Sequence, residues 1–228
     1  MEDDLHYGYF ATGNESLAEA TDALTNEMMQ LADCSAGRRV LDIGCGTGRA
    51  ACRLAAEFGS DVVGVSPSNA CVQRSRERSL GLERGSATFV AADGMALPYP
   101  DSSFDVAWVM ESSHLMSDKP RLIQECGRIL RPGGVMVLCD IILARKLSLP
   151  EVIDHRDDFL LLKDVFDRAR METMEFYESE AAKVGLRPFH SRNIAVQTRP
   201  TFQHWRNNAL THQAEVVSSI GDTGRNHQ

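Results

Sequence analysis

Three glycines at alternate positions follow a short apolar run in the first quarter of the chain. The run Val40–Ile43 leads into Gly44, Gly46 and Gly48, and an alanine-rich stretch over residues 47–58 follows. Glycine allows a backbone to approach a ligand closely and to adopt a positive φ, and the first turn of a helix favours a negative group such as a carboxylate. Because a bare strand-to-helix turn needs one glycine and not three, this spacing predicts a ligand-binding turn.

Two residues suited to proton transfer follow later strand-like runs. His114 comes after the run over residues 104–110, and Asp140 comes after the run over 135–139. Histidine suits this chemistry because its reference pKa of about 6.5 lies near neutral pH. The two side chains could converge on one reacting atom, with His114 as general base and Asp140 as a second base or as the group that orients it. The alternatives are a half-buried, hydrogen-bonded His114 and an Asp140 that caps the next segment.

The segments around these residues alternate between strand-like and helix-like patterns. Strands are expected over residues 39–43, 61–65, 87–91, 104–110 and 135–139, and helices over 16–32, 47–58, 66–80 and 119–130. Such alternation predicts an α/β fold with a Rossmann-like, doubly wound and mostly parallel sheet and with helices on both of its faces. Ligands of these sheets bind at the carboxyl ends of the strands, which is where the glycines, His114 and Asp140 occur.

Local signals predict where three of the elements begin. Ser16 and Glu19 have the spacing of a capping box. Ser66 followed by Pro67 makes a favourable N-cap and first helical residue. Residues 132–134, Pro-Gly-Gly, are expected to form the turn that enters the last of the five strands.

A dinucleotide such as NAD is the competing ligand for the glycine turn. Its fingerprint places a third glycine three residues after the second, and an acidic residue about 20 residues later. Here the third glycine would fall on Arg49, and the end of the second strand carries Ser66. Both departures count against NAD.

Four ordered segments resemble the motifs of class I S-adenosylmethionine (SAM)-dependent methyltransferases. They are Asp42–Gly48, Ala92–Gly94, Leu97–Asp105 (LPYPDSSFD) and Ile129–Gly134 (ILRPGG). The resemblance implies the class I methyltransferase fold, SAM as methyl donor and S-adenosylhomocysteine as product. In that family an aspartate at the Asp93 position reads the adenine amino group. Ser66 occupies the position that meets the ribose, and its alternative role is the helix N-cap.

The resemblance implies one set of cofactor-binding residues and no metal. This set comprises Tyr7, Asp42, Gly44, Cys45, Gly46, Gly48, Ser66, Ala92, Asp93, Gly94, Met110 and Glu111.

Residues 110–118, MESSHLMSD, resemble a segment that follows the fourth strand in one cluster of the family. That cluster contains tocopherol-type and sterol C-methyltransferases, glycine-type N-methyltransferases and antibiotic-sugar O-methyltransferases. The catalytic histidine of the sugar O-methyltransferases lies at the His114 position, and Asp140 matches an acidic residue that assists it. Residues 5–10, LHYGYF, resemble a lid segment that folds over SAM, which places Tyr7 at the cofactor. The resemblance leaves open whether carbon, nitrogen or oxygen is methylated.

We expect a single domain with four parts. They are an N-terminal lid and helix over residues 1–32, a SAM-binding core over 36–140, a substrate-lid insert over 141–180, and a C-terminal strand and helix over 181–228. The insert is rich in apolar residues, and we expect one face to pack on the core and the other to cover the methyl acceptor. An apolar lid favours a specialised metabolite of lipid-like or aromatic character over a glycine-sized acceptor.

The C-terminal end lacks the pattern of a strand. Thr201–Ile220 is expected to form a helix, and the polar run Gly221–Gln228 follows it. Members of the family normally add an antiparallel strand there, so the final strand is expected to be missing. Because an uncovered sheet edge invites pairing, we expect a homo-oligomer or a chain shorter than its natural length.

The composition narrows the choice of partners and compartment. Hydrophobic residues make up 43% and charged residues 25%, and the formal net charge is −8. A net acidic protein repels phosphate backbones, so nucleic acid is not an expected substrate. No apolar run approaches the roughly 20 residues that span a bilayer, and Met1–Asp4 is acidic with no apolar run behind it. We therefore expect a cytoplasmic enzyme without a membrane segment or signal peptide.

The six cysteines include no C-x-x-C pair, which argues against a zinc site. Two other functions fit parts of the sequence pattern. One is a regulatory protein that holds SAM without methyl transfer, and the other is an NAD-linked enzyme.

Overall fold

The structure is a computed structural model that describes residues 6–32, 34–166 and 169–213. These residues form two compact units, one built from residues 28–191 and the other from residues 6–27 and 192–213. The polar run at the C-terminus lies outside the described residues, as do Leu5 of the N-terminal segment and the last part of the helix expected after Thr201.

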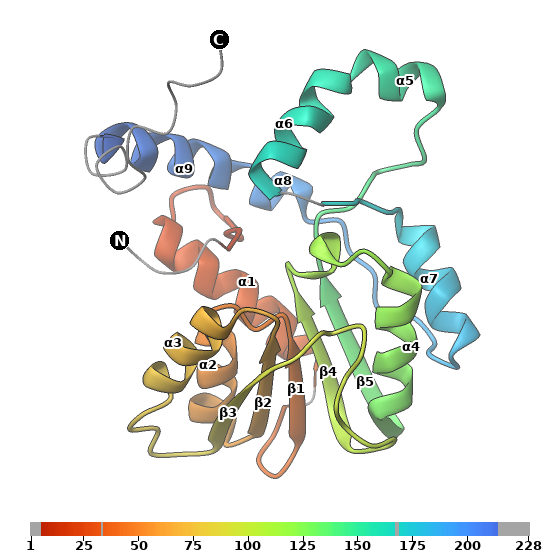
Figure 1. Cartoon of the computed structure of the whole chain (residues 1–228). Helices are drawn as coiled ribbons and strands as arrows, with labels where there is room; N and C mark the ends of the chain where they lie inside the picture. Colours follow the sequence, from red (N-terminus) through yellow and green to blue (C-terminus); the bar gives the residue numbers. More distant parts are fainter. Residues whose placement is uncertain (1–5, 33, 167–168, 214–228) are drawn as a thin grey trace. The chain divides into compact units, whose positions relative to one another are not determined.

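Five parallel strands form one sheet in the first unit, in the order β3-β2-β1-β4-β5 (Figure 1). The strands are β1 (Arg39–Ile43), β2 (Asp61–Ser66), β3 (Ser86–Ala91), β4 (Phe104–Met110) and β5 (Leu130–Cys139). The central strand β1 pairs Asp42 with Gly64 of β2 and with Trp108 of β4. Strand order reverses between β1 and β4, and such a switch point is where sheets of this kind bind ligands. The α/β prediction is confirmed.

Helices cover both faces of this sheet (Figure 1). They are α2 (Arg49–Phe58), α3 (Asn69–Arg78), α4 (Lys119–Ile129) and α7 (Met174–Lys183), of which α7 packs on α4. Two further helices, α5 (Leu149–Asp154) and α6 (Arg156–Phe166), follow β5 and lie away from the sheet (Figure 1). α2 and α3 contact β2 and β3, whereas α4 contacts β4, β5 and α7. In the part of the chain that the structure describes, no helix has the length and apolar character needed to cross a membrane.

The buried face of α4 shows why this helix packs where it does. Leu122, Cys126 and Ile129 recur at helical spacing and join Leu41 and Val109 of the sheet in one hydrophobic cluster. Burying a side chain of leucine or isoleucine size stabilises the fold by about 1.5–3 kcal/mol. This cluster therefore anchors α4 against β1 and β4, and with it the loops at both ends of the helix.

The start of α3 differs from the sequence prediction. Its N-cap is Ser68, whose hydroxyl accepts the Cys71 N–H at 3.3 Å, and not Ser66. Ser66 is instead the last residue of β2, where it pairs with Ala91 of β3. Its buried hydroxyl accepts the Ser68 N–H at 3.3 Å. Strand pairing extends β2 to Ser66, so the next serine becomes the cap.

The start of β5 also differs from the prediction. The strand begins at Leu130, and the segment 132–134 lies inside it rather than before it. Pairing jumps from Phe104 opposite Leu130 to Val106 opposite Val135, so the extra residues bulge out of the ladder. A proline and glycines are tolerated there because bulged residues need not donate to a neighbouring strand.

The second unit joins the N-terminal segment to helices from the other end of the chain. It contains the first part of α1 (Leu17–Leu31), α8 (Ala195–Thr198) and α9 (Pro200–Thr211). The capping box of α1 is present, because Ser16 N donates to Glu19 Oε2 at 2.8 Å and Glu19 N donates to Ser16 Oγ at 3.3 Å. No strand forms between residues 181 and 213, so the expected C-terminal strand is absent from the described residues.

Candidate functional site

The glycine turn connects β1 to α2 at the switch point of the sheet. Gly44 adopts a φ of 83°, and a Cβ built on it would lie 2.3 Å from the Cβ of Ser112. The Ser112 hydroxyl donates to the Ile43 carbonyl at 2.7 Å, so the segment after β4 presses directly on the turn. Only glycine satisfies both the positive φ and this close approach.

The other two glycines of the turn meet different surroundings. Gly48 precedes α2 with a φ of 79°, and a Cβ there would lie 2.8 Å from both Phe89 and Ser75. Gly46 has a φ of 52°, but a Cβ built on it would meet no atom of the described residues within 4 Å. The turn is therefore packed against protein at Gly44 and Gly48 and faces open space at Gly46, as the cradle of a ligand would.

The aspartate and the cysteine of the turn are both buried. Asp42 lies near the end of β1, and Cys45 follows Gly44. Burial raises the pKa of the Cys45 thiol, and the nearby Asp42 carboxylate raises it further. A thiol held protonated in this way is a poor nucleophile. Cys45 therefore contributes packing and backbone rather than covalent chemistry.

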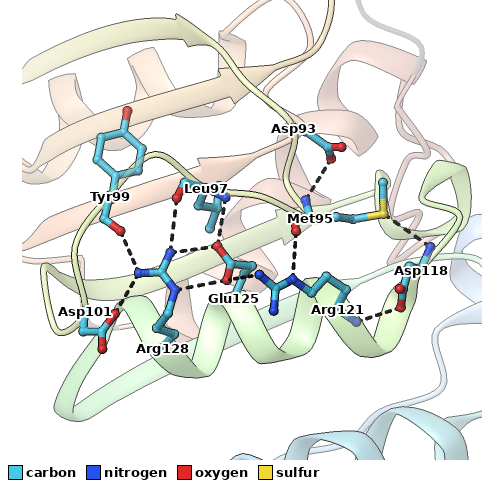
Figure 2. Close-up of polar contacts among 9 residues, drawn as sticks. All are labelled: Asp93, Met95, Leu97, Tyr99, Asp101, Asp118, Arg121, Glu125 and Arg128. Carbon is cyan, nitrogen blue, oxygen red and sulfur yellow. Dashed lines mark hydrogen bonds and ion pairs between the residues drawn. The ribbon is translucent and has the colours of Figure 1, made fainter.

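Asp93 follows β3 with an exposed carboxylate. Its Oδ1 accepts the Met95 N–H at 2.9 Å (Figure 2), whereas its Oδ2 accepts no hydrogen bond from the described residues. Gly94 is buried behind it, because a Cβ there would lie 2.7 Å from a side chain of β1. The Ala92 N–H donates to the Ser66 carbonyl at 3.0 Å, which ties this loop to the end of β2. One oxygen of the oriented carboxylate can thus accept from a ligand amino group.

A charged network braces the loop that carries Asp93 (Figure 2). Glu125 of α4 is buried, and its Oε2 accepts the Leu97 N–H at 2.9 Å and an Arg128 N–H at 2.7 Å. Arg128 also donates to the Tyr99 carbonyl at 2.7 Å. Together these contacts hold the pKa of Glu125 below its usual value, with the Arg128 hydrogen bond as the largest cause. The LPYPDSSFD segment is thereby tied to α4.

The segment after β4 begins in a rare backbone conformation. Met110 is the buried last residue of β4, and Glu111 adopts a φ of 49°, which residues other than glycine seldom take. The Glu111 N–H donates to the Cys139 carbonyl at 2.8 Å, which holds this residue against β5. Such strain gathers at functional sites, and here it directly precedes the segment that carries Ser112 and His114.

The structure brings His114 and Asp140 together. His114 Nδ1 lies 2.6 Å from Asp140 Oδ1, and the two side chains are 6% and 0% exposed. His114 belongs to a 3-10 turn (Ser113–Leu115) after β4, and Asp140 follows the neighbouring strand β5. Because an ionised carboxylate only accepts, Nδ1 carries the proton and the basic lone pair lies on Nε2. An aspartate orients a histidine base in this way in other enzymes.

Two residues that the sequence analysis did not single out complete this cluster. Ser113 Oγ donates to Asp140 Oδ2 and lies 2.8 Å from the hydroxyl of Tyr177 on α7. Both Ser113 and Tyr177 are buried. Ser113 lies within the MESSHLMSD segment, next to His114, and that position was a signal of its role. Tyr177 lies 64 residues further along, and no local pattern marks it.

The insert between β5 and α7 is attached to the same cluster. The Arg170 N–H donates to the His114 carbonyl at 2.8 Å. Lys119, the first residue of α4, is buried, and burial lowers its pKa while the carboxylates of Glu172 and Asp140 act in the opposite direction. The end of the insert near residues 170–172 therefore contacts the turn that carries His114, and it also places a carboxylate near the buried Lys119.

The described helices of the insert differ in how they pack. α5 has no buried residue, and the apolar side chains of Leu149, Ile153 and Leu161 are exposed. α7 instead makes the contact with α4. α5 spans only six residues, and its apolar residue Val152 is exposed as well.

Tyr7 belongs to the second unit. Its ring packs edge-on against Phe202 and tilted against Trp205, with centroids 5.5 and 5.0 Å apart. The neighbouring Gly8 N–H donates to the buried Thr201 hydroxyl at 2.9 Å. The N-terminal segment is therefore held to α9 by ring contacts and by a hydrogen bond of its own.

Comparison with known proteins agrees with this architecture. A family model described as a methyltransferase domain matches residues 41–138. The 27-O-demethylrifamycin SV methyltransferase of Amycolatopsis mediterranei is 34% identical over 219 residues, which cover 92% of this chain and 79% of that protein. The methyltransferase GfsG of Streptomyces halstedii is 37% identical over 205 residues, which cover 87% of this chain and 71% of that protein.

A solved structure adds to these sequence relatives. The crystal structure of the [4+2]-cyclase SpnF superposes with a TM-score of 0.79 at 28% sequence identity, and the match covers 96% of this chain and 76% of that one. Each of these three matches extends well beyond the segment matched by the family model. Each also covers more than two thirds of the length of the related protein. The chain belongs to the family of SAM-dependent methyltransferases that act on small molecules.

Proposed function

We propose that the chain transfers a methyl group to a hydroxyl oxygen of an apolar small molecule, with His114 as general base and Asp140 as the residue that orients it. The observation that carries this proposal is the 2.6 Å contact between His114 Nδ1 and Asp140 Oδ1 at the carboxyl ends of β4 and β5. A hydroxyl must lose its proton as it is methylated, whereas a neutral amine or a nucleophilic carbon can form the bond to the methyl group first and release a proton afterwards. A built base therefore favours an oxygen acceptor.

The glycine turn and the loop after β3 fit SAM. Open space lies beside Gly46 at the start of α2, where the positive end of a helix favours the carboxylate of an amino acid. Asp93 offers one carboxylate oxygen that could accept from the adenine amino group. Bound SAM supplies a methyl group on a positively charged sulfur, which makes it a strong methyl donor, and it leaves as S-adenosylhomocysteine.

The residues of the chain would handle the acceptor and its proton. The acceptor oxygen forms its new bond to carbon while its proton passes to His114 Nε2, and the imidazolium later returns that proton to solvent. Asp140 stabilises the imidazolium through the Nδ1 contact and keeps the ring in the required tautomer. Such proton transfer typically contributes about 10²–10⁴-fold, and holding the acceptor in line contributes several kcal/mol more.

The acceptor class rests on the insert and on the relatives. Leu149, Ile153 and Leu161 of the insert present apolar side chains to solvent. One relative acts, by its name, on 27-O-demethylrifamycin SV, a small molecule with an O-methyl site. We therefore propose a specialised metabolite with an apolar or aromatic body and a free hydroxyl as the acceptor.

The His114→Ala variant tests this function. Against a panel of hydroxylated apolar molecules, with methyl transfer followed by labelled SAM, we expect turnover to fall by about 10²-fold or more while SAM affinity is kept. Asp140→Asn should lower turnover in the same direction by a smaller factor. The exposed His190 provides a matched control, and His190→Ala should behave as the unaltered protein. An unchanged rate in His114→Ala, with chemistry shown to be rate-limiting, would remove the base from the mechanism.

A further inference from the structure

We infer that Tyr177 and Ser113 form a directed hydrogen-bond chain that positions Asp140 and, through it, His114. This inference rests on the proposed role of His114 as the base. The Tyr177 hydroxyl lies 2.8 Å from Ser113 Oγ, Ser113 Oγ donates to Asp140 Oδ2, and Asp140 Oδ1 lies 2.6 Å from His114 Nδ1. The chain joins α7, the turn after β4 and the end of β5, which are distant in sequence.

Counting hydrogens gives this chain a direction. Asp140 Oδ2 also accepts the His114 backbone N–H at 2.9 Å, and Oδ1 accepts the Ile141 N–H at 2.8 Å. Each oxygen thus accepts two hydrogen bonds, which is the bonding pattern of an ionised carboxylate. Ser113 has a single hydroxyl hydrogen, and that hydrogen goes to Asp140. Tyr177 must therefore be the donor in its contact with Ser113.

Burial keeps water away from the hydrogen-bond chain, so its members hold one arrangement instead of exchanging among several. Ser113 is 0% and Tyr177 is 7% exposed. Burial raises the pKa of the Tyr177 hydroxyl, so the phenol keeps the proton that it donates. Hydrogen bonds in such an environment polarise one another and restrict the orientation of each member. Tyr177 is therefore a positioning residue, because it acts on the reacting atoms only through Ser113 and Asp140.

Removing the Tyr177 hydroxyl should loosen the hydrogen-bond chain one member after another. Without the Tyr177 hydroxyl, the Ser113 hydroxyl loses the partner that fixes its rotation. The Asp140 carboxylate then loses part of its restraint about its terminal torsion. A fraction of His114 can then adopt the Nε2–H tautomer, which has no lone pair on Nε2 with which to take a proton.

The Tyr177→Phe variant removes this hydroxyl and little else. We expect kcat to fall about fivefold, the effect of one buried hydrogen bond, while the KM values for SAM and for the acceptor stay unchanged. The matched control is Tyr99→Phe, which removes the hydroxyl of a half-buried tyrosine in the loop between β3 and β4. That control should keep the kcat of the unaltered protein.

Two readouts separate a positioning role from a general structural one. In the His114→Ala background, Tyr177→Phe should cause no further loss of kcat, and an equal loss in both backgrounds would overturn the inference. Side-chain ¹⁵N NMR of His114 should show an increased Nε2–H fraction in Tyr177→Phe, and an unchanged tautomer would also overturn it. If Tyr177→Phe fails to fold, the same kcat comparison and the same NMR measurement can be made with Ser113→Ala, which removes the next hydroxyl of the hydrogen-bond chain.

The same experiments distinguish this inference from the proposed function. If His114→Ala keeps the full rate while the His114 tautomer still responds to Tyr177→Phe, the positioning inference is supported and the general-base role of His114 is rejected. If His114→Ala loses activity but the His114 tautomer is unchanged in Tyr177→Phe, the general-base role is supported and the positioning inference is rejected.

Discussion

Among single residues, the three glycines of the turn meet different constraints. A side chain at Gly44 would collide with Ser112, and one at Gly48 would collide with Phe89, so substitution at either disturbs the fold itself. Gly46 is constrained by its φ of 52°, while the space beside it is open. A substitution at Gly46 is therefore the most direct way to ask whether a ligand uses this space.

We predict that Gly46→Val weakens SAM binding by at least about tenfold, as measured by isothermal titration calorimetry. The added side chain fills the open space and also costs about 1–2 kcal/mol in a left-handed conformation. Gly81→Val isolates the second effect, because Gly81 has a φ of 84° and no atom of the described residues near its Cβ position. That control should bind SAM normally. Equal affinity for Gly46→Val and the unaltered protein would place the cofactor elsewhere.

The sequence was sufficient to propose two members of the His114 cluster but not a third. His114 and Asp140 could be proposed as neighbours because the carboxyl ends of parallel strands meet at one edge of a sheet. Tyr177 could not be proposed, because its contact with Ser113 spans 64 residues and depends on how α7 packs against α4. A single buried tyrosine on an amphipathic helix reads as ordinary core until the packing is known.

At the scale of elements, the loop between β3 and β4 depends on α4. Its backbone is held by Glu125 and Arg128, which form hydrogen bonds to the Leu97 N–H and to the Tyr99 carbonyl (Figure 2). Glu125 is nearly buried, so its charge is stabilised by these partners rather than by water. Asp93 lies near the start of this loop, so the position of its carboxylate should respond to a change on α4.

We predict that Glu125→Gln lowers the free energy of unfolding at pH 7 by about 1–3 kcal/mol, measured by urea denaturation. The Arg128 hydrogen bond holds the pKa of Glu125 below its usual value in the folded state. Stability from such a group is present above the unfolded pKa and is lost as the pH falls through the folded pKa. The difference between variant and unaltered protein should therefore shrink below about pH 4.

The control for this prediction is Glu83→Gln, which neutralises a solvent-exposed glutamate beyond α3. It should leave the unfolding free energy nearly unchanged at both pH values. If Glu125→Gln destabilised the protein equally at pH 7 and at pH 3, shape rather than charge would explain the effect.

Element starts show what sequence patterns leave undecided. The capping box at Ser16 and Glu19 formed because its signal is wholly local. The cap of α3 moved from Ser66 to Ser68 because pairing with β3 extended β2. That pairing belongs to the sheet and not to the segment, so two serines separated by one residue could not be ranked from the sequence.

At the scale of the whole chain, residues from opposite ends fold together in the second unit. The Gly8 N–H donates to Thr201 across 193 positions, and the Phe10 N–H donates to the Gln197 carbonyl at 3.0 Å. The resemblance to a lid segment could be read from residues 5–10, but its attachment to α9 could not, because no local pattern links the two. The behaviour of the N-terminal segment should therefore depend on the C-terminal helices.

We predict that Thr201→Val makes the amides of residues 6–10 exchange with deuterium about fivefold faster, as measured by mass spectrometry. Valine keeps the shape of the buried threonine but cannot accept the Gly8 hydrogen bond. Thr198→Val is the matched control, because that exposed hydroxyl donates to a carbonyl within α8 and has no role in holding the N-terminal segment. Unchanged exchange in Thr201→Val would show that this hydrogen bond does not restrain the segment. If the segment is a lid for SAM, added SAM should slow its exchange in the unaltered protein, and a smaller slowing in Thr201→Val would connect attachment to α9 with cofactor binding.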